Sequence, residues 1–193
     1  ELFRVSKIQI VACGTSYYAG MVAKYWVESI AKIPVEVDVA SEFRYRQPVY
    51  AKGGLTLLIS QSGETADTLA ALRHAKQHKQ YIASIVNVQS STIARESDLI
   101  IPTLAGPEIG VASTKAFTAQ LTCLAVLAIA LGGNNAELLT QLADAPAKLA
   151  GILNDNQYED IAAEVAKAKT VLYIGRGTAY PIALEGALKL KEL

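Results

Sequence analysis

The sequence predicts an α/β protein with a doubly wound, parallel five-stranded sheet and helices on both faces. Short β-branched runs alternate with longer helical patterns, and several of these runs are apolar on both faces rather than alternating. Strands that are apolar on both sides are typical of a parallel sheet covered by helices on each face. The expected strands are residues 8–12, 35–39, 55–59, 82–88 and 99–101.

Three regions are expected along the 193 residues. Residues 1–133 hold the complete sheet and end with an apolar helix, which Gly132 and Gly133 terminate. Residues 134–169 are polar and Ala-rich and predict a connector with two helical stretches. Residues 170–193 repeat the plan of the beginning, with a strand at 170–174, a Gly-Arg-Gly turn and a helix opened by Pro181. This last region predicts the start of a second, similar domain.

Composition excludes several classes of function. Eighteen Lys and Arg balance eighteen Asp and Glu, so no basic field exists to collect nucleic acid or anionic lipid. The longest apolar stretch, 121–131, is about half the roughly 20 residues that a bilayer crossing needs. Cys13 and Cys123 lack paired-thiol or metal-ligand spacing, which favours a reducing, cytoplasmic location without a disulfide. The ends at Glu1 and Leu193 favour a fragment of a longer chain.

Three loops are candidates for ligand binding, because ligands of open parallel sheets bind where strands lead into helix N-termini. Thr15 and Ser16 follow the first strand, and by themselves they suit an ordinary helix cap. The stretch 108–115 brings Val111 and Ser113 to a later helix start, and it also suits a capped helix with a solvated Lys. The loop after the third strand is the most polar, with Ser60, Gln61, Ser62 and Thr65 within six residues.

This third-strand loop predicts a neutral cradle for a phosphate. It lacks the Gly-Lys-Ser or Gly-Lys-Thr of a nucleotide-binding loop, so a sugar phosphate fits better than ATP. Gly14 lies outside any G-x-G-x-x-G pattern, which argues against a dinucleotide. His74 and His78 are four residues apart on a polar helix without acidic or Cys partners, so we expect surface histidines and no metal site.

The final helix carries Glu185, Lys189 and Glu192 on one face. A carboxylate beside an ammonium suits proton transfer next to a carbonyl or imine, with Glu as the base and Lys stabilising the oxyanion. The same spacing is common in solvated ion-pair ladders, and spacing alone favours that alternative.

Together these motifs resemble the isomerase region of the glucosamine-6-phosphate synthase family, which is built from sugar isomerase (SIS) domains. The resemblance rests on Cys-Gly-Thr-Ser at 13–16, Ser-Glu-Phe-Arg-Tyr at 41–45, Ser-Gln-Ser-Gly-Glu-Thr at 60–65, the stretch 108–115 and Leu-Glu-Gly-Ala-Leu-Lys-Leu-Lys-Glu at 184–192. It implies conversion of fructose 6-phosphate to glucosamine 6-phosphate, without cofactor or metal. Glutamine would enter only through a glutaminase domain outside this sequence, and a homodimer is expected.

The resemblance also implies roles for particular residues. Phosphate would be held by the loop at 60–65 and the sugar contacted by Thr15 and Ser113. Glu192 would be the base, with Lys189 beside it and Glu185 in support. The family's ring-opening His, Schiff-base Lys and glutaminase Cys are absent from this sequence, so we expect these 193 residues alone to be inactive. Two alternatives are another SIS-type isomerase or deaminase, and a non-catalytic sugar-phosphate sensor.

Overall fold

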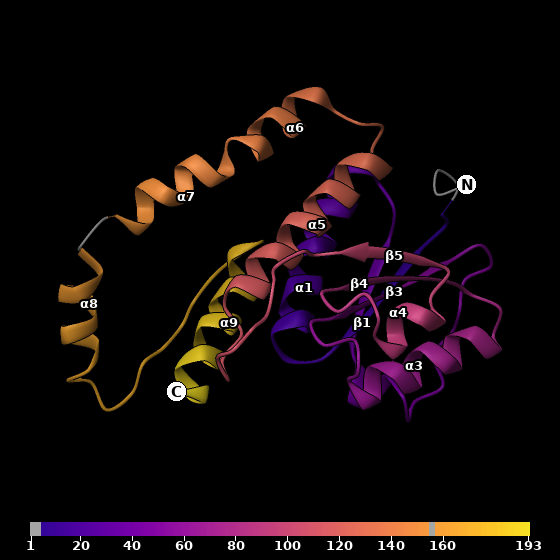
Figure 1. The fold of residues 1–193 in the computed structure, drawn as a ribbon, viewed down its shortest axis with the longest axis horizontal. Coiled ribbons are helices and arrows are strands. Elements are labelled where there is room, and N and C mark those ends of the chain that lie inside the picture. The colour runs from indigo at the N-terminus through magenta and orange to yellow at the C-terminus, as the bar shows by residue number, and fades with distance from the viewer. Residues whose placement is uncertain (1–4, 155–156) are drawn as a thin grey trace.

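The computed structural model describes residues 5–154 and 157–193. They form a sheet with helices on both faces, and a separate helical segment extends from this sandwich (Figure 1). The strands are β1 (Ile8–Ala12), β2 (Val35–Val39), β3 (Leu55–Ser60), β4 (Tyr81–Val86) and β5 (Leu99–Pro102). The helices are α1 (Gly14–Ile30), α2 (Ala40–Phe43), α3 (Ala66–Gln77), α4 (Thr92–Glu96), α5 (Lys115–Leu131), α6 (Ala136–Ala143), α7 (Ala145–Leu153), α8 (Gln157–Val165) and α9 (Ala179–Glu192).

The five strands form one parallel sheet in the order β2-β1-β3-β4-β5. Ile8 at the start of β1 pairs with Val35 of β2 on one side and with Leu55 of β3 on the other. Strand β1 therefore lies inside the sheet, and the chain runs from it to the β2 edge and then crosses back to build the other half. This doubly wound topology confirms the predicted fold class, and its strand order reverses next to β1, where such sheets bind ligands.

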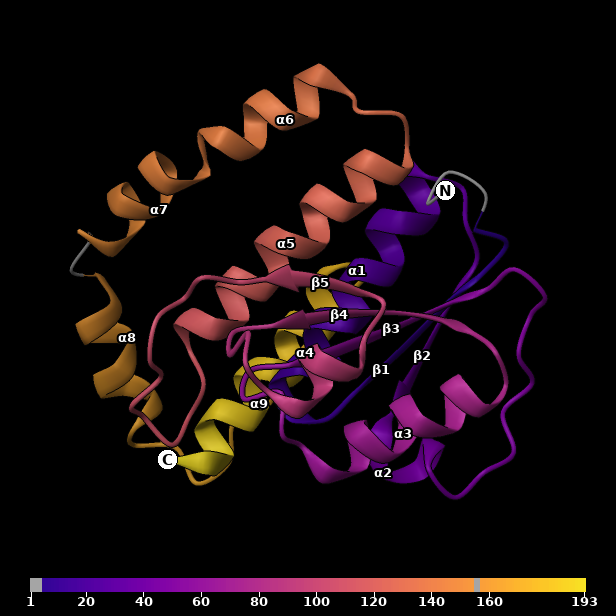
Figure 2. The same ribbon diagram turned by 45° about the vertical axis from the view of Figure 1, so that its right-hand side comes forward.

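Two apolar layers explain why the central strands carry hydrophobic residues on both faces. One face, which includes Ile10 and Leu57, packs against α1 and α5. The opposite face, which includes Val11 and Leu58, packs against α2, α3 and α4. Neighbouring residues of a strand point to opposite faces. The three central strands, β1, β3 and β4, thus supply both layers, and the sheet lies between the two sets of helices (Figure 2).

The structure changes three of the expected elements. Strand β4 ends at Val86 rather than at residue 88, because the Asn87 side chain binds the loop after β5, accepting from Thr103 Oγ1 (3.1 Å) and Ala105 N (2.9 Å). The described residues of the connector hold three short helices in place of two. Residues 170–174 are not a strand, since no neighbouring strand is present among the described residues to pair with them, and Leu172 and Ile174 are exposed.

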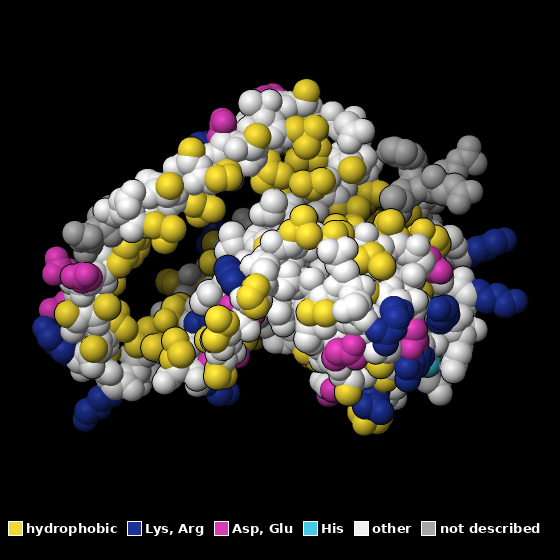
Figure 3. Space-filling view, in the orientation of Figure 1, with side chains coloured by type: hydrophobic (Ala, Val, Ile, Leu, Met, Phe, Trp, Pro, Cys, Tyr) yellow, Lys and Arg dark blue, Asp and Glu magenta, His cyan; other side chains and the backbone are white. Residues whose placement is uncertain are grey.

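The connector helices α6 to α8 form an arc that leaves the sandwich and returns to it (Figures 1 and 2). Neither α6 nor α7 has a buried residue. Hydrophobic side chains line the inner side of the arc (Figure 3). The exposed apolar residues of this part of the chain include Leu139, Leu149, Ile152, Leu153, Tyr158 and Ile161.

Helix α9 returns to the sandwich and packs against α1. Pro181 lies in its first turn, as expected for a residue whose fixed φ suits a helix start. Its side chain is buried. The packing brings α9 beside the carboxyl end of β1, although some 170 residues separate the two segments. Within the described ranges, no helix is both long and apolar enough to cross a membrane.

Candidate functional site

A polar pocket of about 260 Å³ opens at the carboxyl ends of β1 and β3. Every predicted substrate-binding residue lines it, together with two of the three residues predicted on the last helix. The lining consists of Cys13, Thr15, Ser16, Ile59, Ser60, Gln61, Ser62, Thr65, Val111, Ser113, Lys189 and Glu192. Four separate segments of the sequence therefore converge on one cavity.

The loop after β3 is held in shape by its own hydrogen bonds. Ser60 Oγ accepts from Gly63 N (3.0 Å) and lies 3.0 Å from Thr65 Oγ1. Gly63 has a φ of +66°, and a Cβ at this position would fall on the Ser91 side chain. Only glycine satisfies both conditions without distortion. The loop is thus a preformed turn that leads into α3 and leaves Gln61 and Ser62 at the cavity.

Glu64, the acidic residue of this loop, is engaged outside the pocket. Its Oε1 accepts from Thr92 N at the start of α4 (2.7 Å). This backbone hydrogen bond holds the pKa of the Glu64 carboxyl below its usual value. Because its carboxylate is tied to α4, the loop offers hydroxyls and an amide to a ligand, as a phosphate requires.

Thr15 and Ser16 lie in the first turn of α1, where backbone N–H groups lack intrahelical acceptors and the helix dipole favours an anion. Gly14 begins the helix with a φ of +54°, and Cys13 precedes it without a side-chain cap. Thr15 and Ser16 are both nearly buried. Both residues line the pocket, and the hydrogen bonds of their hydroxyls are to the side chains of Glu185, Lys189 and Gln120 rather than to the backbone of α1.

The charged residues of α9 form a network centred on Lys189. Lys189 Nζ lies 2.5 Å from Glu192 Oε2 and 3.4 Å from Glu185 Oε1, and it donates to Thr15 Oγ1 (2.9 Å). Thr15 Oγ1 in turn donates to Glu185 Oε1 (3.0 Å). Glu185 is only 5% exposed. The set of ion pairs is therefore solvated only at its Glu192 end, because Glu185 is buried and Lys189 is half-buried where α9 packs on α1.

The surroundings shift the proton affinities of two of these groups. Burial raises the pKa of the Glu185 carboxyl, against the opposing effects of Thr15 and Lys189. Burial also lowers the pKa of Lys189, but the hydrogen bond and charge of Glu192 and the charge of Glu185 outweigh it and leave the pKa raised. Lys189 therefore remains an ammonium at neutral pH, beside the carboxylate oxygens of its helix.

The third loop is anchored by an acidic residue that was not assigned a role from sequence. Glu108 Oε1 accepts from Thr114 N (3.2 Å) and its Oε2 accepts from Ala116 N (3.1 Å). Both N–H groups belong to the start of α5, which this side chain caps. The cap fixes the loop that carries Ser113 and Val111 to the pocket rim, where Val111 is 96% exposed.

Sequence reasoning missed two pocket residues and one residue in contact with the pocket wall. Cys13 and Ile59 line the cavity but were not among the predicted site residues. Gln120 of α5 is 1% exposed and its Nε2 donates to Ser16 Oγ (2.9 Å). A single amide inside the apolar run of α5 was the signal that could have identified Gln120.

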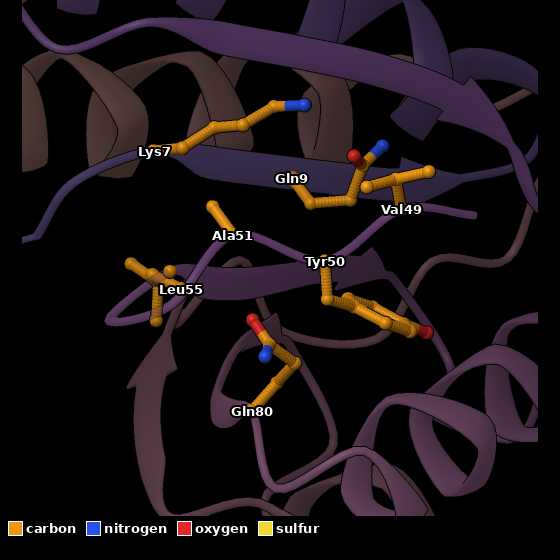
Figure 4. Close-up of a pocket in the computed structure, with 8 residues that line it drawn as sticks. Lys7, Gln9, Val49, Tyr50, Ala51, Leu55 and Gln80 are labelled. Carbon is orange, nitrogen blue, oxygen red and sulfur yellow. The ribbon is translucent and has the colours of Figure 1, made fainter.

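The opposite end of the sheet has a hollow of only about 10 Å³ between the starts of β1 and β3. In Figure 4, Lys7 and Gln9 lie on one side of the segment 49–51 and Gln80 lies on the other. Such a space holds about one water molecule and no sugar. In the part of the chain that the structure describes, no cluster of three or more His, Cys, Asp or Glu side chains could bind a metal ion.

His74 differs from the expected surface histidine. Its Nδ1 lies 2.7 Å from the Tyr50 hydroxyl, and its ring stands edge-on to Phe43 at 6.3 Å. Burial lowers the pKa of His74, and the charge of His78 adds to this effect. His78 is exposed, as expected. This aromatic cluster joins α3 to the chain before β3, and none of its members lines the polar pocket.

Comparison with known proteins gives long, close matches. The chain is 57% identical over its whole length to a glutamine–fructose-6-phosphate aminotransferase (isomerizing) from Zymomonas mobilis, and 58% identical over 98% of its length to one from Bradyrhizobium diazoefficiens. The chain spans 33% of the length of each of these relatives. It therefore corresponds to one part of a larger protein of this kind.

Solved structures agree with this match. The C-terminal domain of glucosamine-fructose-6-phosphate aminotransferase from Francisella tularensis superposes with a TM-score of 0.93 at 46% identity, covering 99% of this chain and 57% of that one. A glucosamine-6-phosphate deaminase from Thermotoga maritima has a TM-score of 0.75 at 26% identity, covering 95% and 57%. The family model of the SIS domain matches residues 1–130. With the parallel sheet and its pocket, these matches show that the chain belongs to the SIS domain family.

Proposed function

We propose that this chain is the sugar-phosphate isomerase part of an enzyme that converts fructose 6-phosphate to glucosamine 6-phosphate with ammonia derived from glutamine. One observation carries the proposal: the loop at 60–65, whose hydroxyl and amide groups form the cradle for the phosphate, lines the same cavity as the Lys189–Glu192 pair. The cradle suits the phosphate of a small sugar. The charged pair suits proton transfer at the other end of the same substrate.

The proposed roles follow from position in the pocket. Ser60, Gln61, Ser62 and Thr65 hold the phosphate through hydroxyl, amide and backbone groups at the start of α3. Ser16 adds a hydroxyl from the start of α1, while Thr15, Val111 and Ser113 contact the sugar. Since the cradle itself is neutral, specificity for an anion comes from oriented dipoles rather than from a cluster of cations.

The proton transfer is assigned to Glu192. As a carboxylate, Glu192 removes a proton from C1 of the aminated ketose, leaving an enolamine, and then returns a proton to C2 to give the 2-amino aldose. The ammonium of Lys189, 2.5 Å from Glu192, stabilises negative charge on the sugar oxygen during the transfer. Glu185 supports Lys189 from the buried side of the helix.

Further parts of the proposal concern the whole protein. The exposed apolar inner side of the connector, and the exposed apolar residues of 170–174, favour a second similar domain that begins near residue 170 and covers them. Glutamine would act only through a separate glutaminase domain. We also propose a cytoplasmic homodimer, as the pairing of two sugar isomerase units suggests.

Calorimetric titration tests the phosphate cradle. Fructose 6-phosphate, glucosamine 6-phosphate and inorganic phosphate are titrated into the complete polypeptide that carries this sequence and into residues 1–193 alone. We expect Ser62→Ala to weaken sugar-phosphate binding about 5- to 10-fold, the effect of one hydrogen bond to a charged group. Ser29→Ala, on the exposed far end of α1, is the matched control. Absence of binding by the complete polypeptide would contradict the proposal.

The principal competitor is a deaminase or a different isomerase of the same fold. The rate of amino-sugar synthesis from fructose 6-phosphate is compared with the rate of the reverse reaction, which releases ammonia from the amino sugar. This comparison distinguishes the proposed function from the competitor. A sensor without catalysis would show no turnover even in its unsubstituted form. Its affinity for sugar phosphate would be the same in the Glu192→Gln variant as in the unsubstituted protein.

A further inference from the structure

Gln120 is a buried amide at the centre of the packing between α5 and α1. Its neighbours one turn away on α5, Ala116 and Leu124, are buried apolar residues. Gln120 is 1% exposed, and its Oε1 has no hydrogen-bond partner among the described residues. An amide buried in this way costs free energy compared with an apolar side chain of the same size. Its presence therefore calls for a role other than packing.

The hydrogen bond of the Gln120 side chain joins it to the pocket. Its Nε2 donates to Ser16 Oγ at 2.9 Å, and Ser16 lines the cavity. With one lone pair of Oγ occupied by this N–H, the hydroxyl proton of Ser16 stays free to donate. The orientation observed leaves Oε1 and the second N–H of Nε2 without a partner among the described residues, whereas the reverse orientation would leave both N–H groups without one. Unpaired buried N–H groups are rarer in proteins than unpaired carbonyl oxygens, which favours the orientation observed.

We propose that Gln120 is a positioning residue that fixes Ser16 as a hydrogen-bond donor to the bound phosphate. Phosphate oxygens only accept, so a hydroxyl that had already given its proton to the protein would be lost to the ligand. By donating to Ser16, Gln120 sets both the rotamer and the polarity of that hydroxyl before the ligand arrives. This inference rests on the proposed function, because it presupposes an anion in the pocket.

Two substitutions separate polarity from packing. Gln120→Met keeps the length of the side chain but frees Ser16 to rotate, and we expect the KM for fructose 6-phosphate to rise about 3- to 10-fold with kcat within about 2-fold. Gln120→Glu keeps the shape but replaces the donor with an acceptor, which takes the Ser16 proton and adds a charge. We expect it to raise KM more, by about 10- to 100-fold at neutral pH.

Matched variants on a solvated surface provide the controls. Gln77 of α3 is exposed, so Gln77→Met and Gln77→Glu make the same chemical changes away from the pocket. Both are expected to leave KM unchanged within about 2-fold. Thermal midpoints are measured for all variants, so that a general loss of folded protein is recognised apart from a change in KM.

A double-mutant cycle in the complete polypeptide decides the proposal. If Gln120 acts through Ser16, Gln120→Met has an effect within about 2-fold when Ser16 is already Ala. If Gln120→Met raises KM as much in the Ser16→Ala background as in the wild type, its role is packing and the proposal fails. It also fails if Gln120→Met leaves KM unchanged in a wild type that binds sugar phosphate. A wild type that binds no sugar phosphate would overturn the proposed function itself, and this inference with it.

Discussion

Both ends of the sheet carry polar side chains, but the two ends differ in the partners of those side chains and in the size of the cavity beside them. At the amino end, polar side chains satisfy one another: Lys7 pairs with Glu36 at 2.5 Å, and the Tyr50 hydroxyl with His74 at 2.7 Å. The hollow that remains there is about 10 Å³. At the carboxyl end a cavity of about 260 Å³ is lined by hydroxyls whose capacity is only partly used.

The difference follows from the parallel sheet. Each strand leads at its carboxyl end into a loop and the start of a helix, so free N–H groups gather there, while helix ends and paired charges gather at the other end. Substitutions of side chains that line the pocket at the carboxyl end should therefore change ligand binding or turnover more than stability. Substitutions at the amino end should change stability alone.

The largest effect is expected for Glu192→Gln. Loss of the carboxylate should lower kcat about 100-fold or more, while the affinity for fructose 6-phosphate changes by less than about 3-fold. The measurement is steady-state formation of glucosamine 6-phosphate by the complete polypeptide. Glu164→Gln is the matched control, because Glu164 also pairs with a Lys three residues away but lies on α8, away from the pocket. Equal effects of the two variants would contradict the role of Glu192.

Gly63→Ala should damage both the cradle and the fold around it. Its Cβ would meet Ser91 while φ is +66°, so we expect a loss of about 2–4 kcal/mol in the free energy of unfolding and weaker phosphate binding. Gly106→Ala is the control, since Gly106 has a φ of +68° but no atom lies within 4 Å of the place its Cβ would take. It should cost only about 1 kcal/mol. Denaturant unfolding measures the free energy of unfolding of both variants. Equal losses would show that the strain of the positive φ accounts for the effect and that the clash with Ser91 adds nothing.

At the amino end, His74 should make stability depend on pH. Because burial lowers its pKa in the folded state below the ordinary 6.5, the unfolded chain binds more protons as the pH falls through this region. The free energy of unfolding is therefore full above about pH 6.5 and declines below it. His74→Gln should flatten this slope, and His78→Gln should retain most of it, since burial is the larger cause. A slope unchanged by His74→Gln would refute the assignment.

The smallest effect is expected for Arg73→Ala, which breaks the exposed Arg73–Glu96 pair between α3 and α4. Exposed pairs contribute little, so the free energy of unfolding should change by less than about 0.5 kcal/mol, with phosphate binding unaffected. A change above about 1 kcal/mol in chemical denaturation would mean that this surface is more strongly coupled to the core than its exposure indicates.

The sheet and the three polar loops could be predicted from the sequence because each depends on a local pattern. The runs that contain Leu57 and Ile85 are apolar at nearly every position, and glycine and hydroxyl residues follow the strands directly. The packing of α9 on α1 could not be predicted from spacing. Whether Glu185 faces solvent or Thr15 depends on a contact across 170 residues.

Other differences have similar physical causes. Residues 170–174 have the composition of a strand, but a strand forms only where a neighbour supplies hydrogen bonds. Gln120 binds the Ser16 hydroxyl, which is 104 residues away in sequence, and Glu108 caps the start of α5 across a loop. These partners could be identified only from the folded structure. Residue type thus indicated the chemistry of the pocket, and tertiary packing determined which side chains support it.

The most direct test of the account is a structure of the complete polypeptide with fructose 6-phosphate bound. We predict the phosphate within hydrogen-bond distance of Ser60, Ser62 and Thr65, and the C1–C2 end of the sugar beside Glu192. A phosphate bound at the amino end of the sheet, or a sugar turned away from α9, would contradict the account.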